Sequence, residues 1–252
     1  MLAQERHNYI LELLKSKRTV QASQLMKLFD VSSETVRRDL EYLEKEGLLR
    51  RVHGGAALVK MDTTQGFFKS RMSTNIEYKK EIAQKALAYV SEGYSIALDC
   101  STTSLIFAQK LKEEFHSLTI VTNSNEILNM LTDMGSYRII CCGGIFNQDE
   151  RACFGDQAIN MVRQLNLDVA FIGVGGISIR ESFTENYFEG AAMLRAYLNA
   201  AQKKIVLADH TKFDTVTFVK ICEPDEVDLI ITDSDIKQKT LEKYRINGFE
   251  II

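Results

Sequence analysis

Two adjacent arginines stand in a segment whose residue types suit DNA recognition. In the stretch VSSETVRRDLEYLEKEG, apolar side chains recur at Val36, Leu40 and Leu43, which is the spacing of one helical face. An advance of about 100° per residue from Val36 places Arg37 and Arg38 on the opposite, exposed arc. Guanidinium groups near a helix N-terminus are suited to binding phosphates and base edges. A solvated helix face has the same composition, so the neighbouring segments must decide between the two interpretations.

A second group of polar residues suits phosphate binding. In LDCSTTSLIFAQKL an apolar run ends, three hydroxyl residues follow at Ser101, Thr102 and Thr103, and a helical pattern begins. Backbone N–H groups at a helix N-terminus, together with hydroxyls, form a cradle for a phosphate. On this segment alone, a plain helix N-cap with spare hydroxyls is the favoured interpretation.

Further polar clusters end other apolar runs. Asn123 and Ser124 end one run, and Asp209 with Lys212 ends another; Gly173, Gly175 and Gly176 lie where a backbone can approach a ligand closely. Each cluster alone is explained by a cap or a turn. Their expected convergence on one edge of one sheet indicates a ligand site.

The same chain lacks several patterns of cofactor chemistry. It has neither a G-x-G-x-x-G segment nor a P-loop lysine, so we expect no nucleotide cofactor. Its five cysteines include no C-x-x-C pair, which favours reduced thiols over a disulfide or zinc framework. We therefore expect no cofactor, no metal ligands and no catalytic residues.

The elements that position these residues fall into two parts. Three helical patterns followed by two short extended runs around Gly54-Gly55 predict a small α+β winged helix-turn-helix in the first sixty residues. In that motif the second helix enters the major groove with its N-terminal residues leading. The residues expected to face DNA are Ser33, Thr35, Arg37 and Arg38, with Arg50, Arg51 and His53 of the hairpin near the phosphate backbone.

The remaining three quarters predict an α/β domain. Six near-continuous apolar runs, SIALD, LTIVT, RIICC, VAFIG, KIVLAD and DLIIT, alternate with helical stretches. This pattern is typical of a mostly parallel sheet with helices on both faces. A helix is expected from about residue 76 to residue 90. The expected boundaries are 1–57 for the DNA-binding domain, 58–75 for a polar linker and 76–252 for an effector-sensing domain.

Charge is divided unevenly between these parts. Residues 1–60 carry 11 Lys+Arg and 8 Asp+Glu, a net +3, whereas the remainder carries 20 and 26, a net −6. A basic head on an acidic body indicates a polyanion-binding unit joined to a unit of another kind. No apolar run is long enough to span a bilayer and the first residues do not read as a signal peptide, so we expect a cytoplasmic protein without membrane contact.

The sequence also resembles a known family. RHNYILELL and LMKLFDVSSETVRRDLEYLEKEGLLRRVHGGA are similar to the DNA-binding head of the DeoR family of bacterial transcriptional regulators. EYKKEIAQKA, DCSTT, VTNS, CCGG, FIGVGGI, LADHTKF and DLIITD resemble segments of the family's effector domain. The resemblance implies a domain folded like ribose-5-phosphate isomerase, which binds a phosphorylated sugar or related metabolite that usually relieves repression. The effector-binding residues that it implies are Lys79, Asp99, Ser101, Thr102, Thr103, Asn123, Ser124, Gly175, Gly176, Glu189, Asp209 and Lys212.

Three positions depart from the family pattern. Ser101 stands where the family often has glycine, and Gly173-Val174-Gly175-Gly176 stands where it often has G-A-D-G. The segment Gly190–Arg195 replaces the common E-A-E-V-K-R, so its second glutamate and lysine are absent, although Glu189 and Arg195 remain. Either the effector differs from the usual ones, or other groups hold its phosphate.

Three functions compete. The first is a DNA-binding regulator, most simply a repressor of a sugar-utilisation operon, which binds double-stranded operator DNA as a homodimer or homotetramer and is released by a phosphorylated sugar. The second is a sugar-phosphate isomerase-like enzyme with an added DNA-binding head. The missing carboxylate weighs against it, and Asp99, Asp209 and Glu189 are the candidate replacements for the base. The third is a large domain that serves only for oligomerisation.

Overall fold

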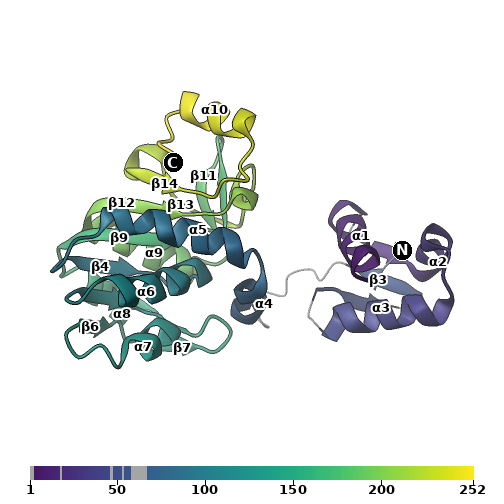
Figure 1. The fold of residues 1–252 in the computed structure, drawn as a ribbon, viewed down its shortest axis with the longest axis horizontal. Helices are drawn as coiled ribbons and strands as arrows, with labels where there is room; N and C mark the ends of the chain where they lie inside the picture. Colours follow the sequence, from purple (N-terminus) through teal and green to yellow (C-terminus); the bar gives the residue numbers. More distant parts are fainter. Residues whose placement is uncertain (1–2, 18, 46–47, 53, 58–66) are drawn as a thin grey trace. The chain divides into compact units, whose positions relative to one another are not determined.

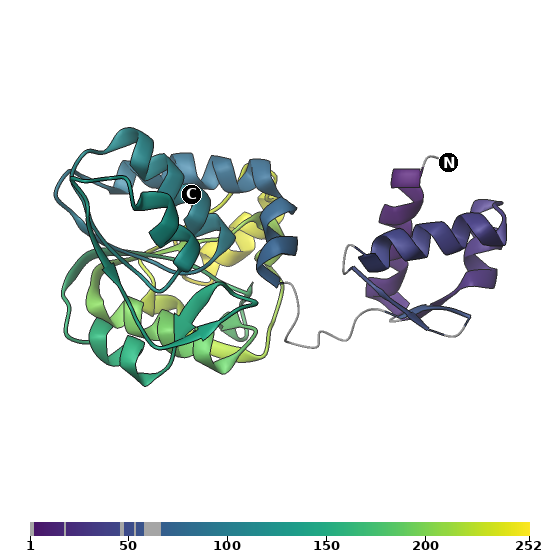
Figure 2. The same ribbon diagram turned by 90° about the horizontal axis from the view of Figure 1, so that it is seen from below.

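The computed structural model describes residues 3–17, 19–45, 48–52, 54–57 and 67–252 (Figures 1 and 2). The chain forms two compact units, Met1–Gly66 and Phe67–Ile252. In the described part, no helix is both long and apolar enough to cross a membrane.

The first unit is a winged helix-turn-helix, as predicted. Its strands form one antiparallel sheet in the order β1-β3-β2. The strand β1 was not expected from the sequence. It pairs with β3, and an added Cβ at Gly55 would lie 2.0 Å from the carbonyl oxygen of Val20, so only glycine fits at this crossing. The elements are α1 (Ala3–Lys17), β1 (Thr19–Gln21), α2 (Ala22–Phe29), α3 (Ser33–Lys45), β2 (Arg50–Val52) and β3 (Gly55–Ala57).

Helix α3 begins and packs as its sequence indicates. The Ser32 hydroxyl accepts a hydrogen bond from the Thr35 backbone N–H at 3.2 Å, which satisfies one free donor of the first turn. The buried stripe, Val36, Leu40 and Leu43, packs with residues of α1 and α2 in the core of this unit. The helix therefore presents its other face to solvent. The expected C-cap, Gly47, lies outside the described residues.

The predicted linker is partly wrong. Residues 67–75 were expected to be irregular, but Phe67–Ser73 form helix α4, which belongs to the second unit. Phe68 is buried in the core that α5 and α6 share, and it lies four residues before Met72, which packs against the same core. This i, i+4 apolar pair gives α4 a face to bury. Residues 58–66 lie outside the described part.

The second unit is built on the six strands that the sequence predicts. They form a wholly parallel sheet in the order β14-β12-β9-β4-β5-β6 (Figure 1). The strands are β4 (Ser95–Leu98), β5 (Thr119–Thr122), β6 (Arg138–Cys141), β9 (Leu167–Gly173), β12 (Ala201–Leu207) and β14 (Leu229–Ile231).

Helices cover both faces of this sheet, as predicted. In β9, Val169 and Phe171 join the core beneath α5, α6 and α7, whereas Ala170 and Ile172 join the core beneath α8 and α9. Successive side chains of a strand point to opposite faces, so this run of apolar residues buries both sides. The helices are α5 (Ile76–Ala86), α6 (Thr102–Glu114), α7 (Asn125–Leu131), α8 (Asp156–Val162), α9 (Phe188–Ala200) and α10 (Gln238–Ile246). Helix α5 is shorter than expected, because residues 87–89 form the 3-10 turn η1 (Leu87–Tyr89).

Smaller elements surround the carboxyl ends of the strands, and the sequence patterns did not predict them. A hairpin pairs β7 with β8, and a second antiparallel sheet has the order β10-β11-β13. These strands are too short for a clear alternation pattern. They are β7 (Ile145–Asn147), β8 (Ala152–Phe154), β10 (Gly176–Ser178), β11 (Ser182–Glu185) and β13 (Val219–Cys222), with two further 3-10 turns, η2 (His210–Lys212) and η3 (Pro224–Glu226).

Candidate functional site

The exposed face of α3 carries the residues predicted to face DNA. Ser33 is exposed and Thr35 is half-buried. The side chains of Arg37 and Arg38 are 53% and 75% exposed. In the wing, Arg51 is 40% exposed, of Arg50 only the backbone in β2 is described, and His53 lies outside the described residues.

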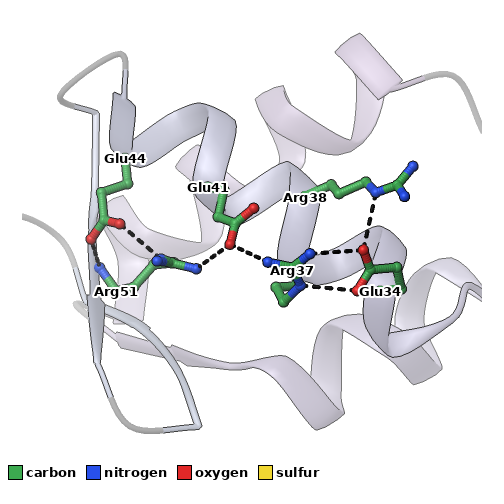
Figure 3. A network of polar contacts seen from close by, with 6 residues as sticks. All are labelled: Glu34, Arg37, Arg38, Glu41, Glu44 and Arg51. Atoms are coloured by element: carbon green, nitrogen blue, oxygen red, sulfur yellow. Dashed lines mark hydrogen bonds and ion pairs between the residues drawn. The ribbon is translucent and has the colours of Figure 1, made fainter.

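Three glutamates hold these arginines in one line of ion pairs, the arginine ladder, which comprises Glu34, Arg37, Arg38, Glu41, Glu44 and Arg51 (Figure 3). Glu34 accepts from Nε and Nη2 of Arg37 at 2.9 and 2.8 Å, and from Nε of Arg38 at 3.2 Å. Glu41 accepts from Arg37 Nη1, and from Arg51 Nη1 at 2.9 Å. Three cations and three carboxylates leave the ladder without net charge, although the whole head is basic.

The ladder joins helix α3 to the wing. Glu44 accepts from the backbone N–H of Arg51 at 2.8 Å and from its Nε at 2.7 Å. Hydrogen bonds from Arg37 and then Arg38 lower the pKa of Glu34 to about 2, and those from Arg51 lower the pKa of Glu44. Glu34 and Glu44 are therefore ionised at neutral pH and compete with DNA phosphates for the arginines.

A buried ion pair that the sequence analysis missed docks α3 against α1. Asp39, whose side chain is 6% exposed, accepts from Arg6 Nε at 2.7 Å and from Arg6 Nη2 at 3.0 Å. Its Oδ1 also lies 2.9 Å from His7 Nε2, and His7 stacks on Tyr42 with ring centroids 4.8 Å apart. A charged residue beside the apolar stripe of α3 was the available signal, since a buried carboxylate requires a partner.

In the second unit, a cavity of about 110 Å³ lies where β4, β9 and β12 end. Its lining includes most of the clusters that the sequence predicts at these strand ends. The lining residues are Arg71, Thr74, Asn75, Lys79, Ser101, Thr102, Thr103, Gly173, Val174, Leu207, Ala208, Asp209, Thr211 and Lys212.

The hydroxyls at the start of α6 differ in whether they already have hydrogen-bond partners. Thr102 and Thr103 are 3% and 7% exposed, and in the described part of the chain their hydroxyls have no hydrogen-bond partner. Ser101 caps α6 by accepting from the Ser104 N–H at 3.1 Å, and its hydroxyl donates to Asp99 at 2.9 Å. The two threonines are thus available to a ligand, whereas Ser101 is engaged.

Asp99 holds the start of α6 in place from outside the cavity. It is buried, does not line the cavity, and accepts from the hydroxyls of Ser101 and Ser104. Burial raises its pKa, and these hydrogen bonds oppose the rise. An added Cβ at Gly173 would lie 2.5 Å from the Cβ of Ser101, so serine at position 101 requires glycine at position 173.

The cavity is cationic. Lys79, Arg71 and Lys212 line it with Asp209 as the only carboxylate in the described lining. Burial lowers the pKa of Lys79 to about 8; Asp209 opposes this effect, and Lys212 and Arg71 add to it. Asp209 is bonded to the N–H of Thr211 at 3.0 Å, while the Lys212 ammonium has no partner among the described side chains and backbone. Such an excess of positive charge in a small cavity favours an anionic ligand.

Arg71, which the sequence analysis placed in a linker, enters this site from α4. Its Nη2 forms an ion pair with Glu150, whose side chain is 6% exposed. Its buried Nε has no hydrogen-bond partner within the described part. The ammonium of Lys79 in turn donates to the backbone carbonyls of Arg71 and Thr74.

Besides Asp99, five further predicted effector residues do not line this cavity. Asn123 donates to the Cys153 carbonyl at 2.9 Å, and Ser124 caps α7. They follow β5, which is one strand farther from the cavity than β4. The backbone of Gly175 bonds Thr184, while Gly176 pairs with β11. Glu189 is exposed in the first turn of α9.

Other lining residues, which lie beyond the strand ends, were not predicted from the sequence. These are Arg71, Thr74 and Asn75 from the presumed linker, with Thr211 from η2. The described residues hold no group of three His, Cys, Asp or Glu side chains placed to bind a metal ion.

Comparisons with known proteins match both units. A family model described as "DeoR C terminal sensor domain" matches residues 74–234, and one described as "DeoR-like helix-turn-helix domain" matches residues 6–62. The chain is 31% identical to the HTH-type transcriptional repressor GlcR of Bacillus subtilis, over 100% of this chain and 96% of that protein. It is 30% identical to the HTH-type transcriptional regulator GolR of Listeria innocua, with 98% and 97% covered.

Another relative of similar length is named as the repressor of a regulon for a phosphorylated metabolite. The chain is 31% identical to the glycerol-3-phosphate regulon repressor of Escherichia coli, over 91% of this chain and 90% of that protein. Among solved structures, the ribose 5-phosphate isomerase A of Methanocaldococcus jannaschii is 18% identical, with a TM-score of 0.39 over 56% of this chain and 55% of that chain.

Proposed function

The chain belongs to the DeoR family of transcriptional regulators, and on that premise we propose that it represses a sugar-utilisation operon and leaves its operator when a phosphorylated sugar or related metabolite binds. The regulatory class follows from the two family matches and from relatives aligned over nearly their whole length. The operon and the effector class are the proposal. The single observation that supports the effector class best is the cationic cavity at the ends of β4, β9 and β12.

The phosphate is proposed to lie at the start of α6. There Thr102 and Thr103 are buried, and their hydroxyls have no hydrogen-bond partner in the described part of the chain. The first N–H groups of this 13-residue helix have no partner within the helix. Lys79 and Lys212 supply the compensating charge. Each hydrogen bond to a charged oxygen contributes roughly 1.5–3 kcal/mol, which is enough to distinguish a sugar phosphate from the free sugar.

Helix α4 is proposed to carry the signal, because it is the first described element after residues 58–66. Its C-terminal end is held by the Lys79 ammonium, and its Arg71 is held by Glu150. A phosphate that attracts Lys79 and Arg71 would change both contacts. A ligand shifts an equilibrium only through its different affinity for the two states, and these contacts supply such a difference.

A sensor is favoured over an enzyme. Isomerisation requires a base beside the carbonyl carbon. Of the three carboxylates considered as replacements, Asp99 is bonded to two serines below the cavity and Glu189 is outside it. Asp209 lines the cavity but caps η2. Incubation with pentose and hexose phosphates should therefore give binding without turnover, and measured turnover would favour the isomerase instead.

A thermal-shift screen tests the effector class. Phosphorylated sugars should raise the melting temperature of the second unit, because a ligand at 100 times its Kd stabilises by about 2.7 kcal/mol. The same sugars without phosphate should not. Lys79→Met should reduce the shift, while Lys80→Met, on the exposed side of α5, should keep it. No shift with any phosphorylated compound in wild type would contradict the proposal and favour a domain that serves only for oligomerisation.

Pairing of two chains is part of the proposal, since one winged head reads only a short half-site. Symmetric operators are read by symmetric proteins, so a homodimer or homotetramer is expected. Sedimentation of the chain with and without a two-half-site duplex measures this directly. A monomer on a single half-site at saturating protein would contradict it.

A further inference from the structure

Glu34 holds the two adjacent arginines of α3 in different ways (Figure 3). All three guanidinium nitrogens of Arg37 already have an acceptor: Nε and Nη2 donate to Glu34, and Nη1 donates to Glu41. Arg38 is held at Nε alone, at 3.2 Å. Within the described part of the chain, Nη1 and Nη2 of Arg38 have no partner, and this side chain is 75% exposed.

This difference matters for base reading. The major-groove edge of guanine offers two acceptors, O6 and N7, which an arginine binds with two of its nitrogens. Arg38, fixed at Nε with both terminal nitrogens free, is prepared for that contact. Arg37 must first leave two carboxylates.

The position of Glu34 also disfavours binding to DNA of arbitrary sequence. Glu34 is the second residue of α3, the helix whose N-terminal residues enter the major groove in this motif. Non-specific binding comes from phosphate contacts. A carboxylate that already satisfies Arg37 and repels phosphates weakens those contacts, which is discrimination through a repulsive element.

Resting on the DNA-binding function proposed above, we infer that Glu34 is a specificity-determining residue. It positions Arg38 to read a guanine and keeps Arg37 from binding phosphates without regard to sequence. The operator preference of the protein therefore depends on an acidic residue, in addition to the basic residues that contact DNA.

The test compares two variants of the full chain with the same change of charge. Glu34→Gln removes the carboxylate beside Arg38, whereas Glu44→Gln removes one that holds Arg51 of the wing and does not contact Arg38. An operator is first selected from a random-sequence duplex pool with wild type. Affinities for this operator and for a scrambled duplex are then measured at one salt concentration.

Both variants should bind the scrambled duplex more tightly, since each loses one negative charge. Only Glu34→Gln should lose preference, with the operator-to-scrambled ratio falling about tenfold, the size of one bidentate base contact. Equal changes of the ratio in the two variants, or an unchanged ratio in Glu34→Gln, would overturn the inference.

A second measurement separates base reading from general loss of structure. Operators carrying 7-deazaguanine, which lacks N7, are compared one guanine at a time. At one guanine, wild type and Glu44→Gln should lose about tenfold in affinity, and Glu34→Gln should lose much less. An equal loss in all three proteins would overturn the inference while leaving DNA binding intact. If wild type prefers no selected duplex, the DNA-binding function itself fails.

Discussion

The ammonium nitrogen of Lys79 lies 2.7 Å from the carbonyl oxygen of Thr74, directly after helix α4, and also donates to the carbonyl of Arg71. The same side chain lines the cationic cavity. One lysine therefore serves both the end of α4 and the proposed effector site. Its protonation and its partners should decide how the two are coupled.

Effector affinity should fall as pH rises from 7 to 9. Burial lowers the pKa of Lys79 to about 8, so the unliganded amine loses its proton across this range. A bound phosphate favours the ammonium, and binding near pH 8 must therefore take up protons. Sugar phosphates, whose second pKa is about 6, keep a nearly constant charge over the same range. Isothermal titration calorimetry in two buffers of different ionisation enthalpy measures the uptake.

Two variants control this experiment. Lys79→Met should bind more weakly and lose the proton uptake, whereas Lys80→Met, which removes an exposed contact with Glu77, should behave as wild type. Proton uptake that persists in Lys79→Met would assign the titration to another group.

Helix α4 should loosen when Glu150 is replaced. The ion pair between Arg71 and the buried Glu150 joins α4 to the segment between β7 and β8, and Glu150→Gln leaves it without its charge. Hydrogen exchange of the α4 peptide should become faster than in wild type, while exchange in α6 should not change. Effector should still bind but release operator less completely. Unchanged exchange in α4 would show that the ion pair does not hold the helix.

Asp39→Asn should destabilise the DNA-binding head. Burial alone would raise the pKa of Asp39, but the hydrogen bonds from Arg6 and His7 outweigh it and lower the pKa. A lowered carboxyl pKa stabilises the fold above its unfolded value of about 3.9, and that stability is lost as pH falls through the lowered value. The variant should lose roughly 1–3 kcal/mol at neutral pH, because a buried guanidinium loses its charged acceptor.

Urea unfolding followed by amide exchange in α1 and α3 measures the effect of Asp39→Asn. The stability difference from wild type should shrink as pH falls below about 3.9, because the carboxyl of the unfolded wild type then takes up a proton, while the folded Asp39, whose pKa is lowered, does so only at still lower pH. A difference that stays constant with pH would mean that the carboxylate charge is not what docks the two helices.

Arg51→Ala should weaken binding to all duplexes alike. Arg51 lies on the wing rather than on α3, and its side chain is 40% exposed. Loss of one phosphate contact should make the slope of log affinity against log salt shallower by about 0.9. A selective loss for the operator, with an unchanged slope, would instead make Arg51 a base-reading residue.

The strands and the start of α6 were predictable because they depend on local pattern. Five of the six apolar runs are buried on both faces, and the sixth forms the half-buried edge strand β6; such a run can be recognised without knowledge of its neighbours. Ser101, Thr102 and Asp209 follow such runs, so their place at the edge of the sheet followed directly. Asn123 was misjudged because strand order in the sheet, not the strand end itself, decides which ends meet.

Other parts depend on contacts between distant residues. Arg71 meets Glu150, which is 79 residues away, and Arg6 meets Asp39, which is 33 residues away; no local pattern predicts either pair. The arginine ladder could be predicted from the sequence only in part. The spacing of Glu34, Arg37 and Glu41 favours i, i+3 and i, i+4 ion pairs from the sequence alone, but the link to the wing required the fold.

The central claim is that a phosphate bound at the start of α6 releases the operator, and an operator-release titration tests it most directly. Wild type, a Thr102→Val/Thr103→Val variant and the exposed control Thr132→Val are each bound to the selected operator and titrated with the phosphorylated sugar that gives the largest thermal shift. The valine variant keeps the shape of the cradle but removes two donors, so all three proteins should bind the operator equally. Wild type and the control should release it at the same concentration, and the valine variant should require at least about tenfold more, since each lost hydrogen bond to a charged oxygen costs about 1.5–3 kcal/mol. Release of the valine variant at the wild-type concentration would contradict the account, because the phosphate would then not lie at this helix.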